Sequence, residues 1–104
     1  MSNPTKPVRL GIVGCGAVTR EMHLPAFIQS PNVEVTYLCD RITKNTQLAK
    51  QEYGLPDARV TGEVKDFAGH VDAALVAVPP KFNAPVTCEL LGMGIDVLCE
   101  KPIA

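Results

Sequence analysis

Four apolar runs along the chain predict the strands of a buried sheet. They extend from Val8 to Val13, from Val33 to Cys39, from Ala73 to Val78 and from Ile95 to Cys99. The segments LGIV and AALVAV within them show little polar alternation, which is typical of strands covered on both faces of a parallel sheet. The run VEVTYLC alternates only in part, which indicates a strand nearer an edge, and residues 59–61 form a fifth, weaker candidate.

Helical patterns lie between these strands. Residues 17–30 are long enough for a crossover helix, which we expect Pro25 to break or restart. In residues 40–54 the apolar positions recur on one side at helical spacing, and Gly54 suits the left-handed residue that follows a helix. These apolar positions are Ile42, Ala49 and Tyr53.

A third helix is predicted after the turn Pro79-Pro80. Asn83 is a good N-cap, Pro85 fits the first turn, and Gly94 ends the helix. The apolar stripe of this helix consists of Val86, Leu90 and Leu91. Strand and helix thus alternate, which predicts an α/β fold with a doubly wound parallel sheet of the Rossmann type. Because the sequence stops shortly after the last strand, we expect this sheet to be incomplete at its C-terminal end.

Composition narrows the class of protein. A chain of 104 residues fits one domain, and 46% hydrophobic against 20% charged residues provides enough apolar material for a core. The formal net charge of −1 gives no basis for binding nucleic acid or an acidic membrane surface. No stretch approaches the roughly 18 consecutive apolar residues of a membrane span, and the N-terminus lacks the apolar core of a signal peptide.

The four cysteines point to a reducing compartment. They are Cys15, Cys39, Cys88 and Cys99. They show no CxxC spacing and no accompanying His cluster, so we expect neither a disulfide framework nor a metal site. The expectation is therefore buried free thiols and a cytoplasmic location.

The segment LGIVGCGAVT, at the passage from the first strand to the next helix, is the first candidate for chemistry. Gly14 can make the tight turn out of the strand, and Gly16, which has no Cβ, lets the backbone approach a diphosphate. The helix that follows would direct its free N–H groups and positive dipole end toward that anion. Thr19 stands where the GxGxxG pattern has its third glycine. Because threonine is bulkier than glycine, we expect it to loosen the close packing of the helix against the strand. Glycines of an ordinary turn are the alternative interpretation.

Asp40 ends the second strand and is the second candidate. It follows Thr19 by 21 residues, close to the spacing of about 20 at which an acid meets the adenosine ribose of a dinucleotide. An Asp in this place can alternatively cap the next turn. Together with the glycine loop, Asp40 favours dinucleotide binding by residues 8–104, with residues 1–7 as a flexible lead-in.

Five motifs carry a resemblance to one family. They are GIVGCGAV, HLPAF at 23–27, CDR at 39–41, VAVPP at 76–80 and CEKPIA at 99–104. Through them the chain resembles the N-terminal nucleotide-binding domain of the Gfo/Idh/MocA oxidoreductases. The EKP triplet after a hydrophobic strand is the most family-specific of these motifs. The resemblance implies that this chain supplies the first five strands of a longer protein and lacks its substrate domain.

The resemblance also implies a cofactor contact at each matching position. The turn along the diphosphate comprises Gly14, Cys15, Gly16, Ala17 and Val18. The adenosine ribose and adenine meet Asp40 and Arg41. Beside the nicotinamide half lie Val78, Pro79, Pro80 and Asn83. Members usually have His where this chain has Asn83, which can still hydrogen-bond or cap its helix. The nicotinamide ribose and the reacting carbon are reached by Glu100 and Lys101.

Lys101 is the candidate catalytic residue. It follows the C-terminal end of a strand, the edge at which open α/β sheets bind ligands. An ammonium beside a positively charged nicotinamide ring loses its proton more readily, which suits proton exchange with a substrate hydroxyl. By spacing alone, a solvated lysine beside Glu100 is the simpler interpretation, and the family resemblance decides against it. His23, next to the helix break, is expected to be structural.

The resemblance predicts the reaction class. The complete protein is expected to transfer a hydride between a nicotinamide cofactor and a hydroxyl of a sugar, cyclitol or similar small-molecule substrate. This chain alone is expected to bind the cofactor without turnover. A non-catalytic nucleotide-binding regulatory module and an NAD-dependent glycosidase of the same family are the alternatives. Nucleic acid and membrane are not expected partners, and the sequence leaves open whether the protein forms a homo-oligomer.

Asp40 predicts NAD rather than NADP as the cofactor. Its carboxylate can accept hydrogen bonds from the adenosine ribose and would repel the 2′-phosphate of NADP at contact distance. Arg41 opposes this preference, because an arginine can form charge-assisted hydrogen bonds with that phosphate. We expect the acid to dominate, since it lies at the strand end and the longer Arg41 is more solvated.

Overall fold

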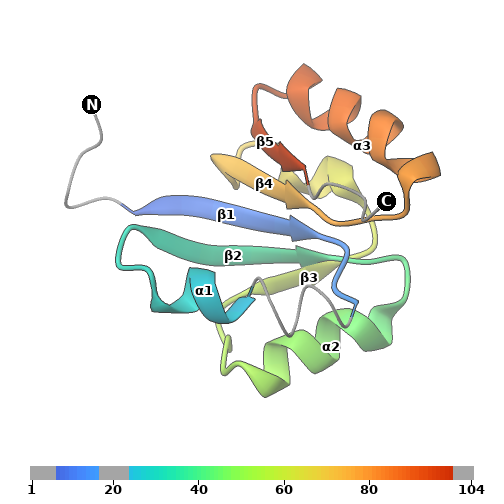
Figure 1. The fold of residues 1–104 in the computed structure, drawn as a ribbon. Coiled ribbons are helices and arrows are strands. Elements are labelled where there is room, and N and C mark those ends of the chain that lie inside the picture. The colour runs from blue at the N-terminus through green and yellow to red at the C-terminus, as the bar shows by residue number, and fades with distance from the viewer. Residues whose placement is uncertain (1–6, 17–23, 100–104) are drawn as a thin grey trace.

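A single parallel sheet organises the residues that the computed structural model describes, which are 7–16 and 24–99. Its strands are β1 (Val8–Val13), β2 (Val33–Cys39), β3 (Arg59–Thr61), β4 (Ala73–Val76) and β5 (Asp96–Cys99). They lie in the order β3-β2-β1-β4-β5 (Figure 1), so the winding reverses between β1 and β4. This order is that of a Rossmann-type sheet, the fold class that the sequence predicted, and the weak strand candidate at residues 59–61 is confirmed and lies at the edge of the sheet.

Helices cover both faces of the sheet. They are α1 (Leu24–Gln29), α2 (Thr43–Glu52) and α3 (Pro80–Gly92), with one short 3₁₀ helix, η2 (Val64–Phe67), that the sequence did not predict. α1 and α2 pack against β2 and β3, whereas α3 and η2 lie on the other face, with α3 against β4 and β5 (Figure 1). The sheet is therefore doubly wound, as the weak polar alternation of its strands indicates.

Gly54 and Gly94 end α2 and α3 where the sequence predicted, whereas the part of the first predicted helix before Leu24 lies outside the described residues. Pro25 is the second residue of α1, where its missing N–H leaves no helical hydrogen bond unmade. Gly54 and Gly94 lie just beyond the caps of α2 and α3 and have φ values of 60° and 77°. Glycine adopts this left-handed conformation without the steric cost that other residues bear.

The core consists of two clusters, one on each face of the sheet. The cluster toward α2 comprises Leu10, Ile12, Cys15, Val35, Leu38, Ala49, Ala58 and Leu75. The cluster toward α3 and η2 comprises Val13, Tyr37, Cys39, Phe67, Val71, Ala74, Val76, Leu90 and Ile95. Successive residues of β4 alternate between the two clusters, so both faces of the central strands are buried.

A β-bulge at Thr36 explains why polar and apolar residues alternate only in part along β2, whose sequence is VEVTYLC. Leu10 of β1 pairs with Val35 of β2. The next residue, Gly11, pairs with Tyr37, so Thr36 is an extra residue in β2. As a result Val35 faces the α2 cluster and Tyr37 faces the α3 cluster. The Thr36 Oγ1 atom is buried and has no hydrogen-bond partner among the described residues.

The structure corrects three predicted boundaries. α3 begins at Pro80 with Pro79 as its N-cap, and not after an N-cap at Asn83, because the fixed φ of Pro80 suits the first helical position. Asn83 is therefore not an N-cap, and Pro85 lies inside the helix. β4 ends at Val76 rather than at residue 78, because the chain already turns toward α3, and β5 begins at residue 96 rather than 95.

Two apolar residues predicted to face the core are exposed instead. Ile42 is 60% exposed, because it caps α2 rather than belonging to it, and the helical spacing does not reach it. Thr46 occupies the buried position, with its hydroxyl donating to the carbonyl oxygen of Thr43 (2.8 Å). Leu91 is 57% exposed, because its neighbour Leu90 turns inward to the α3 cluster.

Gly11 of β1 packs directly against the ring of Phe67. A Cβ on Gly11 would lie 2.5 Å from Cε2 of Phe67, whose side chain is fully buried. We therefore expect Gly11→Ala to lower the free energy of unfolding by about 1–3 kcal/mol, the range for an overpacked core. Urea unfolding measures this loss, and adding Phe67→Leu should recover part of it. A Gly11→Ala protein as stable as the original would contradict the packing described here.

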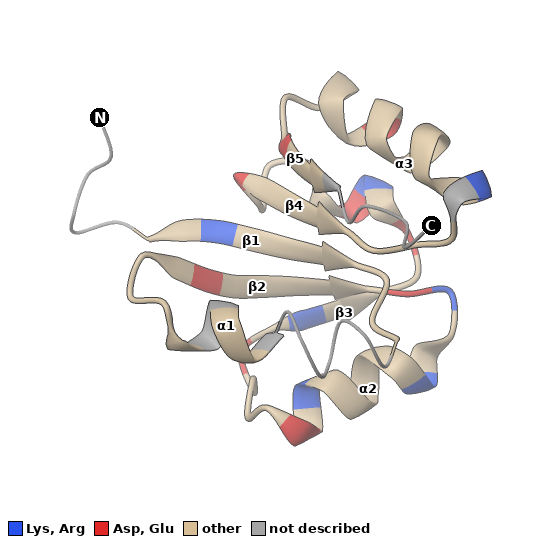
Figure 2. Ribbon diagram, in the orientation of Figure 1, with Lys and Arg blue, Asp and Glu red and all other residues tan. Residues whose placement is uncertain are grey.

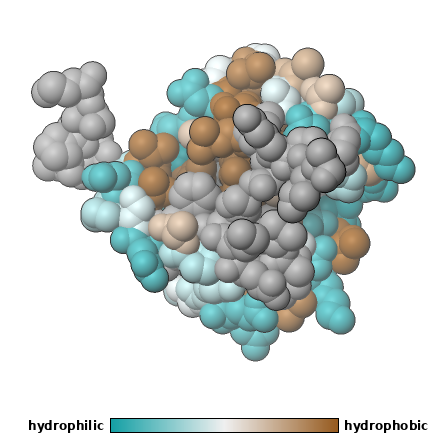
Figure 3. All heavy atoms as spheres, viewed as in Figure 1, coloured by the Kyte–Doolittle hydropathy of each residue, from teal (hydrophilic) through white to brown (hydrophobic). Residues whose placement is uncertain are grey.

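β5 leaves an apolar residue at the edge of the sheet. Among the described strands it pairs with β4 alone. Leu98 pairs with Leu75 of the α2 cluster, yet Leu98 is 53% exposed, because α2 lies over the other half of the sheet. Figure 3 shows hydrophobic residues at the surface on the β4 and β5 side of the molecule. Among the described strands, β5 is therefore an edge strand with an exposed apolar position.

Charges are spread over the described elements. Lys and Arg residues are interspersed with Asp and Glu residues along the ribbon (Figure 2). Within residues 7–16 and 24–99, no helix has the length and apolar character needed to cross a membrane.

Candidate functional site

The glycine turn lies at the carboxyl edge of the sheet, where the strand order reverses between β1 and β4. Open α/β sheets bind their ligands at such a point. Gly14 has a φ of +96°, and a Cβ there would lie 2.2 Å from the carbonyl oxygen of Ala77 and 3.2 Å from Cγ1 of Val78. The Gly14 N–H donates to the carbonyl oxygen of Cys39 (2.8 Å). Only glycine fits this turn, which ties the ends of β1, β2 and β4 together.

Gly16 has a different environment from Gly14. A Cβ built on Gly16 would meet no described atom within 4 Å, and its φ is not positive. Neither strain nor packing therefore requires glycine at this position in the described part of the chain. The open space beside its backbone does fit the close approach of a ligand such as a diphosphate.

Asp40 joins the glycine turn to the end of β2. Its Oδ2 accepts hydrogen bonds from the N–H of Cys15 (2.9 Å) and from Nδ2 of Asn45 (3.2 Å). Its Oδ1 accepts a hydrogen bond from the N–H of Ile42 (2.8 Å), which makes the Asx-turn that leads into α2. The two interpretations of Asp40 are therefore compatible, because it caps the next turn and also lies against the glycine loop.

The loop after β2 contacts the start of α3. The Arg41 guanidinium lies over the ring of Phe82, 5.2 Å from its centroid, and Nζ of Lys81 lies 5.0 Å from the same centroid. Both are cation–π contacts. They place an aromatic ring and two cationic groups beside the turn Pro79-Pro80 that begins α3. This edge thus combines a flat apolar surface with positive charge.

The two cysteines at this edge are buried thiols. Cys15 is fully buried, and its Sγ donates a weak hydrogen bond to the carbonyl oxygen of Cys39 (3.7 Å). Burial, with a smaller contribution from the charge of Asp40, raises the pKa of Cys39 to about 12, so the thiol stays protonated at neutral pH. Because the Cys15 side chain is buried, the part of Cys15 that this edge offers to a ligand is its backbone.

Most of the residues predicted for the site lie at this one edge. Those described there are Gly14, Cys15, Gly16, Asp40, Arg41, Val78, Pro79 and Pro80. Asn83 lies one turn into α3, where its Oδ1 accepts a hydrogen bond from the Thr87 hydroxyl (3.3 Å). Outside the described residues are Ala17, Val18, Thr19, His23, Glu100 and Lys101.

Three residues at this edge were not predicted from the sequence. They are Asn45, Lys81 and Phe82. Asn45 was missed because it reaches Asp40 through the Asx-turn at the start of α2, a local geometry that residue types and spacing alone do not reveal. Lys81 and Phe82 were missed because α3 was predicted to begin four residues too late, with its N-cap at Asn83 rather than at Pro79.

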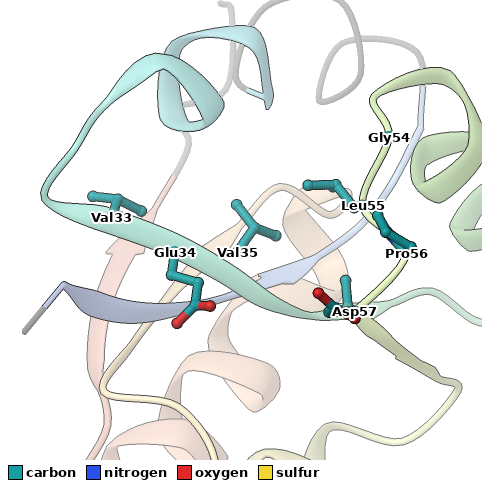
Figure 4. A pocket seen from close by; sticks show the side chains of 8 residues that line it. Val33, Glu34, Val35, Gly54, Leu55, Pro56 and Asp57 are labelled. Carbon is teal, nitrogen blue, oxygen red and sulfur yellow. The ribbon is translucent and has the colours of Figure 1, made fainter.

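A separate pocket lies at the opposite, amino-terminal end of the strands. It has a volume of about 220 Å³ and lies between the start of β2 and the loop before β3 (Figure 4). Its lining residues are Val33, Glu34, Val35, Gly54, Leu55, Pro56, Asp57 and Ala58. Because it lies where parallel strands begin, it is not part of the candidate site. The described residues contain no group of three or more His, Cys, Asp or Glu side chains that could hold a metal ion.

The strand order, the glycine turn and the acid at the end of β2 define a nucleotide-binding domain of the Rossmann type. A family model described as an oxidoreductase family with an NAD-binding Rossmann fold matches residues 8–104. The chain therefore belongs to the Gfo/Idh/MocA family, as its motifs indicated.

Curated and solved relatives agree with this assignment. The chain is 33% identical over 103 residues to a dTDP-3,4-didehydro-2,6-dideoxy-alpha-D-glucose 3-reductase from Streptomyces violaceoruber, covering 94% of this chain and 28% of the relative. KijD10, a 3-ketoreductase from Actinomadura kijaniata solved with TDP-benzene and NADP, is 30% identical with a TM-score of 0.83, covering 93% of this chain and 30% of that one. The WlbA dehydrogenase from Bordetella pertussis, solved with NADH and UDP-GlcNAcA, is 29% identical with a TM-score of 0.82, covering 95% of this chain and 30% of that one. This chain thus spans less than a third of the length of these relatives.

Proposed function

We propose that this chain binds a nicotinamide dinucleotide at the carboxyl edge of its sheet. The proposed setting is an oxidoreductase that transfers a hydride between NAD(P) and a hydroxyl group of a sugar, cyclitol or similar small molecule. The observation that carries the proposal is the hydrogen bond from the Cys15 N–H to Asp40 (2.9 Å), which joins the glycine turn to the acid. Membership of an oxidoreductase family, and relatives named as sugar reductases and dehydrogenases, support the reaction class.

Each described residue has a distinct part in this proposal. Gly14 turns the chain sharply out of β1, and Gly16 leaves its backbone open to the diphosphate. Asp40 accepts a hydrogen bond from the adenosine ribose. Arg41, held over Phe82, offers a flat surface on which adenine can stack. When bound, the cofactor supplies the hydride chemistry, and the protein binds and orients it.

The chemical step is proposed to need residues beyond those described. By resemblance, Glu100 and Lys101 reach the nicotinamide ribose and the reacting carbon, and Lys101 exchanges a proton with the substrate hydroxyl. Substrate contacts are assigned to the part of the relatives' length that this chain does not span. We therefore expect the 104-residue chain to bind cofactor without turnover.

A cytoplasmic location is part of the proposal. Cys15, Cys39 and Cys88 are free thiols, and the first two are buried. Free thiols persist in a reducing compartment, which supports this location.

Cofactor preference tests the role of Asp40 directly. We expect the chain to bind NAD more tightly than NADP by about tenfold or more, because a misplaced like charge costs about 1–3 kcal/mol. Asp40→Ala should shrink this preference, since it removes both the acceptor for the ribose and the charge that repels the 2′-phosphate. Calorimetric titration with each oxidised cofactor, at one ionic strength, measures both affinities.

Asp57→Ala is the matched control for this experiment. Asp57 is exposed and lines the pocket at the other end of the strands, so its removal should leave the NAD preference unchanged. Tighter binding of NADP by the original chain would refute the assignment of Asp40. Binding of neither cofactor would refute the proposed site as a whole.

A further inference from the structure

The Asp40 carboxylate has one unused acceptor position. A carboxylate offers about four lone-pair positions for hydrogen bonds. Oδ2 accepts from the Cys15 N–H (2.9 Å) and from Nδ2 of Asn45 (3.2 Å), while Oδ1 accepts from the Ile42 N–H (2.8 Å). No other described group donates to Asp40. The carboxylate is thus held at three points, and a single position on Oδ1 remains for a ligand hydroxyl.

Asn45 is the side-chain member of this arrangement. The other two donors are main-chain N–H groups, one in the glycine turn and one in the Asx-turn. Asn45 is the third residue of α2, a helix anchored by the buried Thr46 and Ala49. Its amide therefore approaches Asp40 from a fixed helix and limits rotation of the carboxylate about its Cα–Cβ and Cβ–Cγ bonds. The orientation of Oδ1 depends on this contact.

The three described groups that donate hydrogen bonds to Asp40 are all uncharged. An amide is neutral, so Asn45 holds Asp40 without cancelling its negative charge. A lysine or arginine in the same place would cancel that charge. Arg41, the nearest cation in sequence, lies over the Phe82 ring, and no ion pair joins it to Asp40 in the described part of the chain. Asp40 thus keeps both a fixed acceptor and an uncompensated charge, the two properties that favour a ribose hydroxyl over a 2′-phosphate.

We propose that Asn45 is a positioning residue that sets the preference for NAD over NADP by orienting the Asp40 carboxylate toward the adenosine ribose. This inference rests on the proposed function and adds to it a determinant of specificity. Asn45 acts through Asp40 and does not itself touch the cofactor. Its removal should therefore weaken the binding of NAD, which depends on the oriented acceptor, more than the binding of NADP.

The first test compares both cofactors on one variant. For Asn45→Ala, calorimetry should show the Kd for NAD rising about fivefold to tenfold, as for loss of a hydrogen bond to a charged group, and the Kd for NADP changing less than about twofold. If the alanine variant does not fold, Asn45→Ser replaces it in the test. The serine hydroxyl is too short to reach Asp40, so the same changes in the two Kd values are expected. Gln47→Ala is the matched control, because it removes an exposed amide from the same helix. Thermal unfolding verifies that each variant folds.

The second test separates positioning from a general structural role. In an Asp40→Ala background, adding Asn45→Ala should leave the ratio of the two Kd values unchanged, because Asn45 then has no carboxylate to orient. An equal loss of NAD and NADP affinity, or a change of the ratio that persists in this background, would overturn the inference. An original chain that binds neither cofactor overturns the proposed function first, and the role of Asn45 with it.

Discussion

Replacing Gly14 with alanine is expected to abolish the stable fold of this chain. The added Cβ would lie 2.2 Å from the Ala77 carbonyl oxygen, a backbone atom, and the φ of +96° is itself unfavourable for alanine. The backbone cannot give way, because the Ala77 N–H donates to the Val13 carbonyl oxygen (2.8 Å) at the end of the central strand. We expect a loss of at least about 3 kcal/mol in the free energy of unfolding, measured by urea denaturation.

Gly16→Ala is the matched control, because the same change two residues further along meets no described atom. It should alter the free energy of unfolding by less than about 1 kcal/mol, since no described atom lies within 4 Å of the new Cβ. It should nevertheless weaken cofactor binding, because the methyl group occupies the side from which the diphosphate approaches. Equal stability losses in the two variants would contradict the contrast between these glycines.

Substitution of Lys101 should have the largest effect on activity. In a longer protein that contains this chain and its substrate domain, Lys101→Met is expected to lower kcat by about 10²- to 10⁴-fold, the contribution of general acid–base catalysis. The affinity for the cofactor should stay within a few-fold, because methionine keeps much of the side-chain volume. Steady-state kinetics and calorimetry on the same preparation measure the two quantities.

Lys65→Met controls for the loss of a lysine as such. Lys65 lies in η2, is exposed, and its one described ion pair is with Glu63 (3.5 Å), so its loss should leave kcat unchanged. Near-normal activity of Lys101→Met would show that Lys101 is the solvated lysine that spacing alone suggests.

The architecture could be predicted from the sequence because buried parallel strands have a distinct pattern. Residues 10–13 of β1 and the strand β4 are covered on both faces, so they form uninterrupted apolar runs that no amphipathic helix resembles. The short edge strand β3 gave a weaker signal, since only three residues pair there. The glycine turn and Asp40 were predictable for a similar reason, because their chemistry depends on residue type and spacing.

The residues that were missed depend on three-dimensional contacts. Asn45 became part of the site through an Asx-turn, which the residue types of this segment do not distinguish from other turns. Phe82 and Lys81 depend on where α3 begins, and two adjacent prolines made Asn83 seem the better cap. The exposure of Ile42 follows from the same local geometry, because the turn at Asp40 delays the start of α2 by one residue.

The extra residue in β2 affects how sequences of different length can share this site. If Thr36 were absent, Val35 would be followed directly by Tyr37, and the ladder with β1 would run on without interruption. Every side chain from Tyr37 to Asp40 would keep its present face, because the bulge already places Val35 and Tyr37 on opposite sides. A one-residue gap at position 36 in an alignment is therefore neutral for the acid at the strand end, whereas a second deletion between Val35 and Asp40 would shift the register and turn that acid away from the glycine loop.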